Sequence, residues 1–459
     1  MANDYSPAIR KLLGKNKTGT GGRIAVQRGK DLFEGLLMPS SDPDTLVLKL
    51  DSGYNIGIKF GKGVGIRKPE RAEPAKIKEE EKFEIEKSDK AARQEFDKPK
   101  PTISILHTGG TIASRVDYRT GGVVSKFSPE DLLAMFPELK ETANIKTRLV
   151  FSMFSEDMQF AHRQILAREI AKDVESGVDG IIVTHGTDTM HYTSAALAFM
   201  LQNLPIPVIL VGAQRSSDRG STDAAQNLLS AAYFIAHSDF AGVAICMHEN
   251  ASDGSCLILP ATKSRKMHAS RRDAFRPINS LPWARVNYAE NKIEFLKNDY
   301  RKKDKKRKVE SKTKMEEKVA LVKISPNFDG SLIDFFSKKK YKGLVLEGTG
   351  IGHAPVTLLD KYTKRNQELF ISLKKAVEKG MVVCMSSQTI YGRVDMNVYS
   401  TGRDLLKIGV VPCGDMLPET AFIKLAWLLG NFPKKARELM GKNLCGELSE
   451  RTEVDEFLN

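Results

Sequence analysis

Two stretches of the chain place a threonine shortly after an apolar run, where a buried strand would end. Residues 103–106 are followed by Gly110 and Thr111, and residues 180–184 are followed by Thr187. The carboxyl ends of parallel strands meet at one edge of a sheet, and ligands bind at that edge in open α/β folds. A threonine there is either an inert turn residue or a nucleophile. Two of them at one sheet edge favour the nucleophile.

Further polar side chains follow other apolar runs. Asp188, beside the second threonine, is either a helix cap or part of a reactive group. Residues 211–218 form a third polar loop, and Lys263 follows the apolar run at 256–260. A lysine is exposed by default, but one that is drawn into a cleft can lose its proton and act as a base.

The elements that would position these residues alternate along the chain from residue 101. Apolar runs separated by helical stretches predict an α/β fold with a mostly parallel sheet that is covered on both faces. The expected strands are 103–106, 180–184, 207–211 and 242–246, and the expected helices are 129–135, 160–176, 189–203 and 223–236. A smaller α/β unit follows, with strands at 319–324, 343–347 and 380–385 and helices at 358–379 and 419–429. Two such units in series leave a cleft between them.

The front of the chain differs from the rest. Short β-prone runs separated by turn-forming residues predict a small, SH3-like β barrel over residues 1–70. The next segment is dominated by Lys and Glu and predicts a charged linker. The expected domains are therefore 1–70, the linker 71–100, an α/β domain at 101–298, a basic insertion at 299–318 and a second α/β domain at 319–459.

Composition sets the remaining limits. The chain has 459 residues, 41% of them hydrophobic, and no apolar run approaches the ~20 residues of a membrane span. The N-terminus has no secretory pattern, and the five cysteines form no C-x-x-C pair, so we expect a reduced, cytoplasmic protein without a membrane partner. The net charge is +14, and residues 301–318 carry ten basic and four acidic residues, a local charge of +6. That segment is either a solvated insertion or an RNA contact.

Several of these stretches together resemble the asparaginase/glutaminase family. The two signature stretches are Thr-Gly-Gly-Thr-Ile-Ala at 108–113 and His-Gly-Thr-Asp-Thr at 185–189. Val211–Arg215 resembles the family's third strand exit, and Lys263 lies where the family carries its buried lysine. The resemblance covers about residues 101–431 and implies an asparaginase-like, two-domain α/β body.

The resemblance implies a catalytic role for four residues. Thr111 would attack the side-chain amide of the substrate. Thr187, Asp188 and Lys263 would form a hydrogen-bonded relay in which unprotonated Lys263 accepts the proton. Asp188 would position this relay and bind the α-amino group of the substrate.

The resemblance also implies substrate-binding residues. Tyr118 occupies the position of the family's mobile lid tyrosine, and Ser155 would contact the substrate carboxylate, although Glu156 replaces the usual glutamine. The glycine-rich turns with Gly110 and Gly186 would supply backbone N–H groups for the oxyanion. A carboxylate lent by a neighbouring subunit would come from the region 393–399. No metal and no bound cofactor are implied for this chain.

A β barrel and a charged linker in front of such a body resemble the D subunits of archaeal glutamyl-tRNA(Gln) amidotransferases. This resemblance implies a glutaminase that passes ammonia to an E-type partner subunit, which is similar to the bacterial B subunit. The partner would use ATP with Mg²⁺ to convert Glu-tRNA(Gln) to Gln-tRNA(Gln), in an α2β2 heterotetramer around a homodimeric core. One alternative is a stand-alone L-asparaginase, because glutamine and asparagine differ by one methylene, worth only about 1–3 kcal/mol. A second alternative is a basic RNA-binding scaffold with an inactive hydrolase body.

Overall fold

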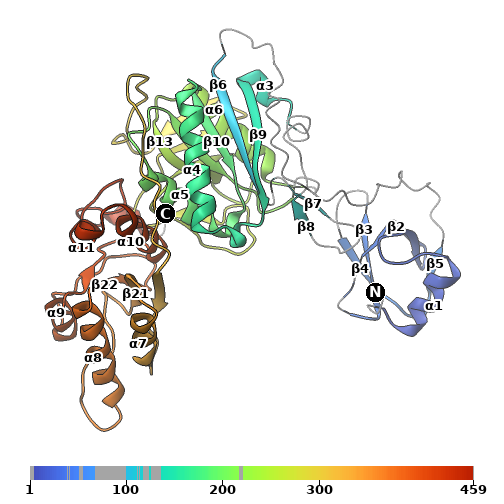
Figure 1. Ribbon diagram of the computed structural model, residues 1–459. Helices are drawn as coiled ribbons and strands as arrows, with labels where there is room; N and C mark the ends of the chain where they lie inside the picture. The colour runs from blue at the N-terminus through green and yellow to red at the C-terminus, as the bar shows by residue number, and fades with distance from the viewer. Residues whose placement is uncertain are drawn as a thin grey trace.

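The computed structural model describes most of the chain (Figure 1). The described residues are 5–38, 40, 42–50, 55–67, 100–110, 112, 114–116, 123–125, 136–216 and 221–457. The predicted linker up to residue 99, the predicted helix 129–135, and the residues Thr111 and Tyr118 lie outside them. None of the helices in the described part of the chain is long and apolar enough to cross a membrane.

The N-terminal unit is a five-stranded antiparallel sheet in the order β4-β3-β2-β1-β5. Its strands are β1 Arg23–Arg28, β2 Asp31–Met38, β3 Thr45–Leu50, β4 Asn55–Lys59 and β5 Val64–Arg67. The expected small β unit is confirmed as this antiparallel sheet. Helix α1 (Pro7–Lys15) was not predicted, and it buries Ile9 and Leu13 against the sheet. Pro at the first helical position suits its start, because the missing N–H would have no partner there.

The largest unit is an eight-stranded sheet in the order β18-β17-β14-β13-β12-β10-β6-β9. Its strands are β6 Thr102–Gly109, β9 Asn144–Met153, β10 Gly180–Thr184, β12 Pro207–Val211, β13 Gly242–His248, β14 Cys256–Pro260, β17 Ala284–Asn287 and β18 Lys292–Phe295. The five strands from β9 to β13 in this order pair in parallel, and the other pairs are antiparallel. The four strands expected from the sequence are confirmed.

Helices cover both faces of this sheet, as the alternating pattern predicted. The main ones are α4 Phe160–Glu175, α5 Met190–Met200 and α6 Ala224–His237, with the short α3 Leu139–Thr142. Within β10, Ile181 and Val183 join the core on the side of α4 and α5, whereas Ile182 joins the core with α6. Successive side chains of a strand point to opposite faces, so a strand buried on both sides is apolar throughout.

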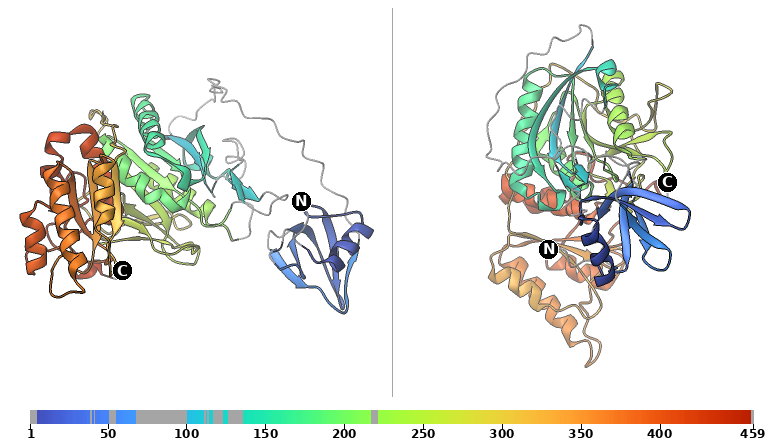
Figure 2. Two further views of the ribbon diagram at one scale, coloured as in Figure 1. Left: turned by 60° about the horizontal axis from the view of Figure 1, so that its bottom comes forward. Right: turned by 90° about the vertical axis from the view of Figure 1, so that its right-hand side faces the viewer.

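The C-terminal unit is a four-stranded parallel sheet in the order β20-β21-β22-β23, shown beside the larger unit in Figure 2. Its strands are β20 Val319–Lys323, β21 Gly343–Gly348, β22 Val382–Ser387 and β23 Val411–Pro412. Its helices are α7 Ser331–Lys338, α8 Lys364–Glu378, α9 Ser400–Lys407, α10 Pro418–Asn431 and α11 Ala436–Met440. Trp427 of α10 stacks on Phe199 of α5 and ties the two units together.

The basic segment 299–318 is packed along the body rather than free in solvent. Its strand β19 (Glu310–Ser311) pairs with β11 (Leu201–Gln202). The Lys312 carbonyl accepts a hydrogen bond from Trp427 Nε1 at 2.7 Å, and Lys305 pairs with Asp179. The segment is therefore an ordered connection between the two α/β units.

Candidate functional site

Three strand-exit loops meet at the carboxyl edge of the eight-stranded sheet. The parallel neighbours β6, β10 and β12 end together, since Thr184 pairs with both His107 and Val211. The Thr108 hydroxyl donates to the Thr184 carbonyl at 2.8 Å, and the His185 N–H donates to the Val211 carbonyl at 2.9 Å. The loops that begin near residues 109, 185 and 212 are therefore hydrogen-bonded at their bases, as the sequence predicted for this edge.

Gly110 and Gly186 bring two of these loops into backbone contact. Gly110 has a φ of 78°, and a Cβ there would lie 2.3 Å from the Gly186 nitrogen. A Cβ on Gly186 would in turn lie 2.8 Å from the Ser155 Cβ. Both glycines are thus required by close approach. The Gly110 N–H donates to the Met153 carbonyl at 3.2 Å, so this residue provides space for the turn instead of the predicted oxyanion N–H.

Thr187 and Asp188 lie together on a short 3-10 helix, η3 (Thr187–Thr189), directly after β10. Thr187 is buried, and its methyl side faces the third loop, where a Cβ on Gly212 would lie 2.7 Å from Thr187 Cγ2. The Asp188 side chain is 65% exposed, so it can meet a ligand that arrives from solvent. The structure therefore places these two predicted residues side by side, with Thr187 buried at the sheet edge and Asp188 on its solvent-exposed side.

The lysine that meets this pair is Lys266, and the sequence-based choice of Lys263 is wrong in this respect. Lys266 Nζ donates to Thr187 Oγ1 at 2.8 Å and to Asp188 Oδ1 at 2.7 Å. Only 10% of the Lys266 side chain is exposed. Lys266 stands three positions further along the same polar stretch, at the end of strand β15 (Ser264–Lys266).

Lys263 points away from the sheet edge. After β14 the chain turns, and the Lys263 N–H donates to the Pro260 carbonyl at 3.3 Å. The side chain enters the junction with the C-terminal unit, where it forms a buried ion pair with Asp415. Burial lowers the pKa of Lys263, and the Asp415 carboxylate opposes this effect. Its amine is thus engaged with the C-terminal unit and not with Thr187.

Ser155 lies against the second loop and is held there from behind. It begins the 3-10 helix η2 (Ser155–Asp157), and the Thr189 hydroxyl donates to its carbonyl at 2.6 Å. Arg163 of α4 donates to the Met158 carbonyl at 2.7 Å, to Thr193 Oγ1 at 3.1 Å and to Thr189 Oγ1 at 3.4 Å. Burial lowers the pKa of Arg163 to about 10. This buried cation, which the sequence analysis missed, fixes η2 against η3.

His185, at the start of the second loop, is fully buried. Its Nδ1 lies 2.7 Å from the Gly186 carbonyl, and its Nε2 lies 3.3 Å from Met158 Sδ. Burial lowers the pKa of His185 to about 4, so the ring is neutral near pH 7. It supports the loop as a neutral group behind Thr187.

The third loop is held by a buried carboxylate. Asp223 accepts hydrogen bonds from the Gln214 and Arg215 N–H groups at 3.0 Å. Asn227 donates to the Gly212 carbonyl at 3.0 Å, and its Oδ1 lies 2.6 Å from His248 Nδ1.

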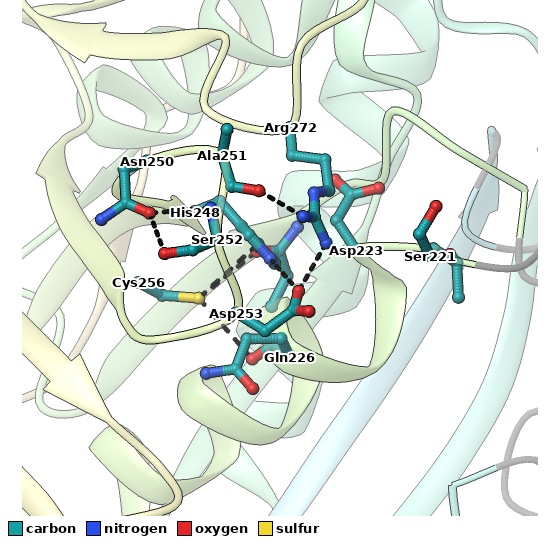
Figure 3. Close-up of polar contacts among 12 residues, drawn as sticks. Ser221, Asp223, Gln226, His248, Asn250, Ala251, Ser252, Asp253, Cys256 and Arg272 are labelled. Atoms are coloured by element: carbon teal, nitrogen blue, oxygen red, sulfur yellow. Dashed lines mark hydrogen bonds and ion pairs between the residues drawn. The ribbon is translucent and has the colours of Figure 1, made fainter.

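Figure 3 shows the outer part of this network, where Arg272 reaches Asp253 and the Ala251 carbonyl beside His248. Asp223 stands at the N-cap position of α6, but its side chain accepts hydrogen bonds from the loop. Among the residues that the structure describes, no group of three or more His, Cys, Asp or Glu side chains could hold a metal.

Chain comparisons give the family context. Family models match residues 102–301 (asparaginase, N-terminal), 318–440 (glutaminase/asparaginase C-terminal domain) and 18–67 (GatD N-terminal domain). The D subunit of the glutamyl-tRNA(Gln) amidotransferase of Pyrococcus furiosus is 50% identical over 441 residues, which cover 95% of each chain. The D subunit of the Pyrococcus abyssi enzyme is 48% identical over 459 residues, which cover 98% of this chain and 99% of the relative.

Solved structures resemble the two-domain body. The thermostable L-asparaginase from Thermococcus kodakarensis is 30% identical with a TM-score of 0.66, and the match covers 76% of this chain and 99% of the asparaginase. L-asparaginase I from Vibrio cholerae is 29% identical with a TM-score of 0.64 over the same shares. The matched share leaves about a quarter of this chain outside the asparaginase-like part.

Proposed function

This chain belongs to the asparaginase family and, within it, to the D subunits of glutamyl-tRNA(Gln) amidotransferases, and we propose that it hydrolyses glutamine to supply ammonia for transamidation. The observation that carries the chemistry is the contact of Lys266 Nζ with Thr187 and Asp188 at the edge where the Gly110 turn arrives. The reaction is an amide hydrolysis within a ligase complex.

Thr111 is the proposed nucleophile, because it directly follows Gly110 in the turn that touches the second loop. A neutral threonine is a weak nucleophile and needs a base to take its proton. Lys266, which contacts Thr187 Oγ1, takes the role first assigned to Lys263. Asp188 positions the Lys266 amine and, from its exposed position, binds the α-amino group of the substrate. Lys266 then returns the proton to the amide nitrogen, which leaves as ammonia, and a water molecule hydrolyses the resulting glutamyl ester of Thr111 to release glutamate.

The substrate carboxylate is proposed to bind at Ser155. Ser155 lies against the backbone of Gly186, the residue that precedes Thr187. The positive charge of Arg163 lies behind the same turn, where it donates to the Met158 carbonyl. A cation in this low-dielectric setting favours an anionic group nearby. Tyr118 is proposed to close over the substrate as a lid residue.

The partner is proposed to be an E-type subunit that uses ATP with Mg²⁺ to activate Glu-tRNA(Gln), and this chain is proposed to form the homodimeric core of an α2β2 heterotetramer. The near-full-length relatives support this assignment over a stand-alone L-asparaginase, because they include the N-terminal unit that the matched asparaginases lack. This chain needs no bound cofactor for the hydrolysis.

The test is ammonia release from glutamine by the purified complex, with and without Glu-tRNA(Gln). Thr111→Ala should abolish glutamine-dependent formation of Gln-tRNA(Gln) while added ammonium still supports it. Loss of both activities would show that Thr111 is structural. Equal turnover of asparagine by the chain alone, unchanged by partner and tRNA, would favour the asparaginase alternative.

A further inference from the structure

The segment that leads to Lys266 is held by the C-terminal unit at successive positions. The Thr262 carbonyl accepts a hydrogen bond from Thr420 Oγ1 at 2.8 Å. Lys263 forms an ion pair with Asp415, and Arg265 lies 3.0 Å from Glu419 Oε1. Residues 415–420, which lead into α10 and form its first turn, therefore hold residues 262–265 in place. Lys266 is the next residue.

The central contact between these two segments is a buried polar hub formed by Lys263, Asp415, Asn279 and Ser449. The Lys263 side chain is 3% exposed, and that of Asp415 is fully buried. Lys263 Nζ also donates to the Asn279 carbonyl at 3.0 Å and to Ser449 Oγ at 2.6 Å. The second oxygen of Asp415 accepts the Ser449 N–H at 3.0 Å. All three donor positions of the ammonium group are thus filled by groups with fixed positions.

The hub lies at the base of the hairpin that carries Lys266. Strands β15 (Ser264–Lys266) and β16 (Phe275–Pro277) pair antiparallel, and the Ile278 N–H donates to the Lys263 carbonyl at 2.7 Å. Asn279 has a φ of 52°, and its Nδ2 donates to the Asp415 carbonyl at 3.1 Å. Both ends of the hairpin are therefore tied to Asp415, one through its carboxylate and the other through its backbone.

We infer that Lys263 and Asp415 are positioning residues for glutamine hydrolysis, which hold the β15–β16 hairpin so that the Lys266 amine meets Thr187. The inference rests on the proposed function. Lys263 acts through Lys266 and takes no proton from the substrate. Because the hub contains residues of both α/β units, the C-terminal unit helps to position Lys266 at the edge of the larger sheet.

A second buried ion pair offers a matched control. Lys424 and Glu447 are both fully buried, and their Nζ and Oε1 atoms lie 2.6 Å apart. This pair joins α10 to the segment after α11, and Lys424 also donates to the Met440 and Lys442 carbonyls, which lie outside the hairpin. Removing one partner of either buried pair leaves an uncompensated charge and lowers stability. Only the removal of Lys263 or Asp415 should also lower the rate of glutamine hydrolysis.

The experiment compares four variants of the full chain in its complex: Lys263→Met, Lys263→Arg, Lys263→Met with Asp415→Leu, and the control Lys424→Met. Thermal midpoints, kcat and KM for glutamine, and the pH dependence of kcat are measured at a temperature where every variant is folded. If Lys263→Met does not fold, Asp415→Asn replaces it, because the amide keeps the shape and removes the charge.

We expect Lys263→Met to lower kcat at least about tenfold with KM changed less than about threefold, since small displacements of a catalytic group are costly. Lys263→Arg should recover most of kcat, because guanidinium keeps the charge and donors but cannot act as a base. The double variant should regain the thermal midpoint but not kcat. Lys424→Met should lose stability with kcat and pH profile unchanged.

Three results would overturn the inference. They are an unchanged kcat in Lys263→Met, a double variant that regains kcat together with its midpoint, and a Lys263→Arg variant as inactive as Lys263→Met. The last result would return Lys263 to the role of base. Failure of the proposed function would look different, because the unaltered complex would then release no ammonia from glutamine.

Discussion

The molecule contains two sheets whose parallel strands end in similar small polar residues, yet the side chains at the two edges have different partners. In the larger sheet the edge holds Thr187 against Lys266, with the Asp188 carboxylate facing solvent. In the C-terminal sheet, Ser386 donates to the Met416 carbonyl at 2.9 Å and Ser387 donates to the Gly350 carbonyl at 2.6 Å. These two hydrogen bonds stabilise the loops at the ends of the strands.

The difference shows that a sheet edge becomes a site through its side-chain partners and not through its topology. Gln388 illustrates the structural use, since its Nε2 donates to the Ile324 and Glu347 carbonyls at 2.7 and 3.0 Å and joins two strand ends. A backbone carbonyl can only accept a hydrogen bond, whereas an amine such as that of Lys266 can donate and also accept a proton. Substitutions at the two edges should therefore have unequal effects on activity.

The largest effect is expected from Lys266→Met. Without its amine, Thr187 and Asp188 lose their shared partner, and glutamine hydrolysis should fall about 10²–10⁴-fold. The measurement is kcat for ammonia release by the complex. Lys292→Met, at an exposed position of β18 in the same sheet, is the control and should keep full activity. Activity within threefold of the unaltered protein would remove Lys266 from the mechanism.

The larger sheet edge should also be the more acid-sensitive one. Burial holds the pKa of His185 at about 4, against an ordinary value of 6.5. Between pH 6.5 and pH 4, His185 is protonated in the unfolded chain but neutral in the folded chain. The contribution of His185 to folding stability is therefore complete above pH 6.5 and decreases as the pH falls toward 4. The loss from this residue is about 3 kcal/mol. Urea midpoints against pH should be flatter for His185→Gln, and parallel curves would contradict this assignment.

A smaller effect is expected from Arg163→Met, which removes the cation behind Ser155. Three hydrogen bonds to the turn and to α5 are lost, which should cost about 2 kcal/mol of stability. Because the substrate carboxylate is proposed to bind at this turn, KM for glutamine should rise more than kcat falls. Steady-state kinetics decide this, and a fall in kcat alone would place Arg163 outside substrate binding.

The smallest effect is expected from Ser387→Ala in the C-terminal sheet. The change removes the hydrogen bond to the Gly350 carbonyl and the one that Ser387 Oγ accepts from the Thr389 N–H, and should lower stability by about 1 kcal/mol. Glutamine hydrolysis should be unchanged, as measured by kcat and KM. A loss of activity comparable to that of Lys266→Met would mean that the second sheet edge takes part in the reaction.

The body of the fold could be predicted from sequence because its signals are local. The apolar runs at 180–184 and 207–211 are strands buried on both faces, and the stretch at 160–176 became helix α4 with almost the same ends. Helix α1 was missed although Ile9, Leu12 and Leu13 have helical spacing, because residues 1–70 were assigned from the β-prone runs that begin at residue 23. The path of the basic segment 301–318 could not be predicted from its charge, because hydrogen bonds of its backbone to α5 and α10 decide that path.

By itself, the sequence determined that Thr187 stands at the sheet edge, because residue order along a parallel strand decides which side chains leave at its carboxyl end. It also placed Gly110 and Gly186 in turns that only glycine fits. Only the tertiary structure decided which lysine serves Thr187. Lys263 and Lys266 are three residues apart and chemically identical, and a turn after β14 sends one to Asp415 and the other to Thr187. That choice depends on partners about 80 and 150 residues away in the chain, which no local pattern encodes.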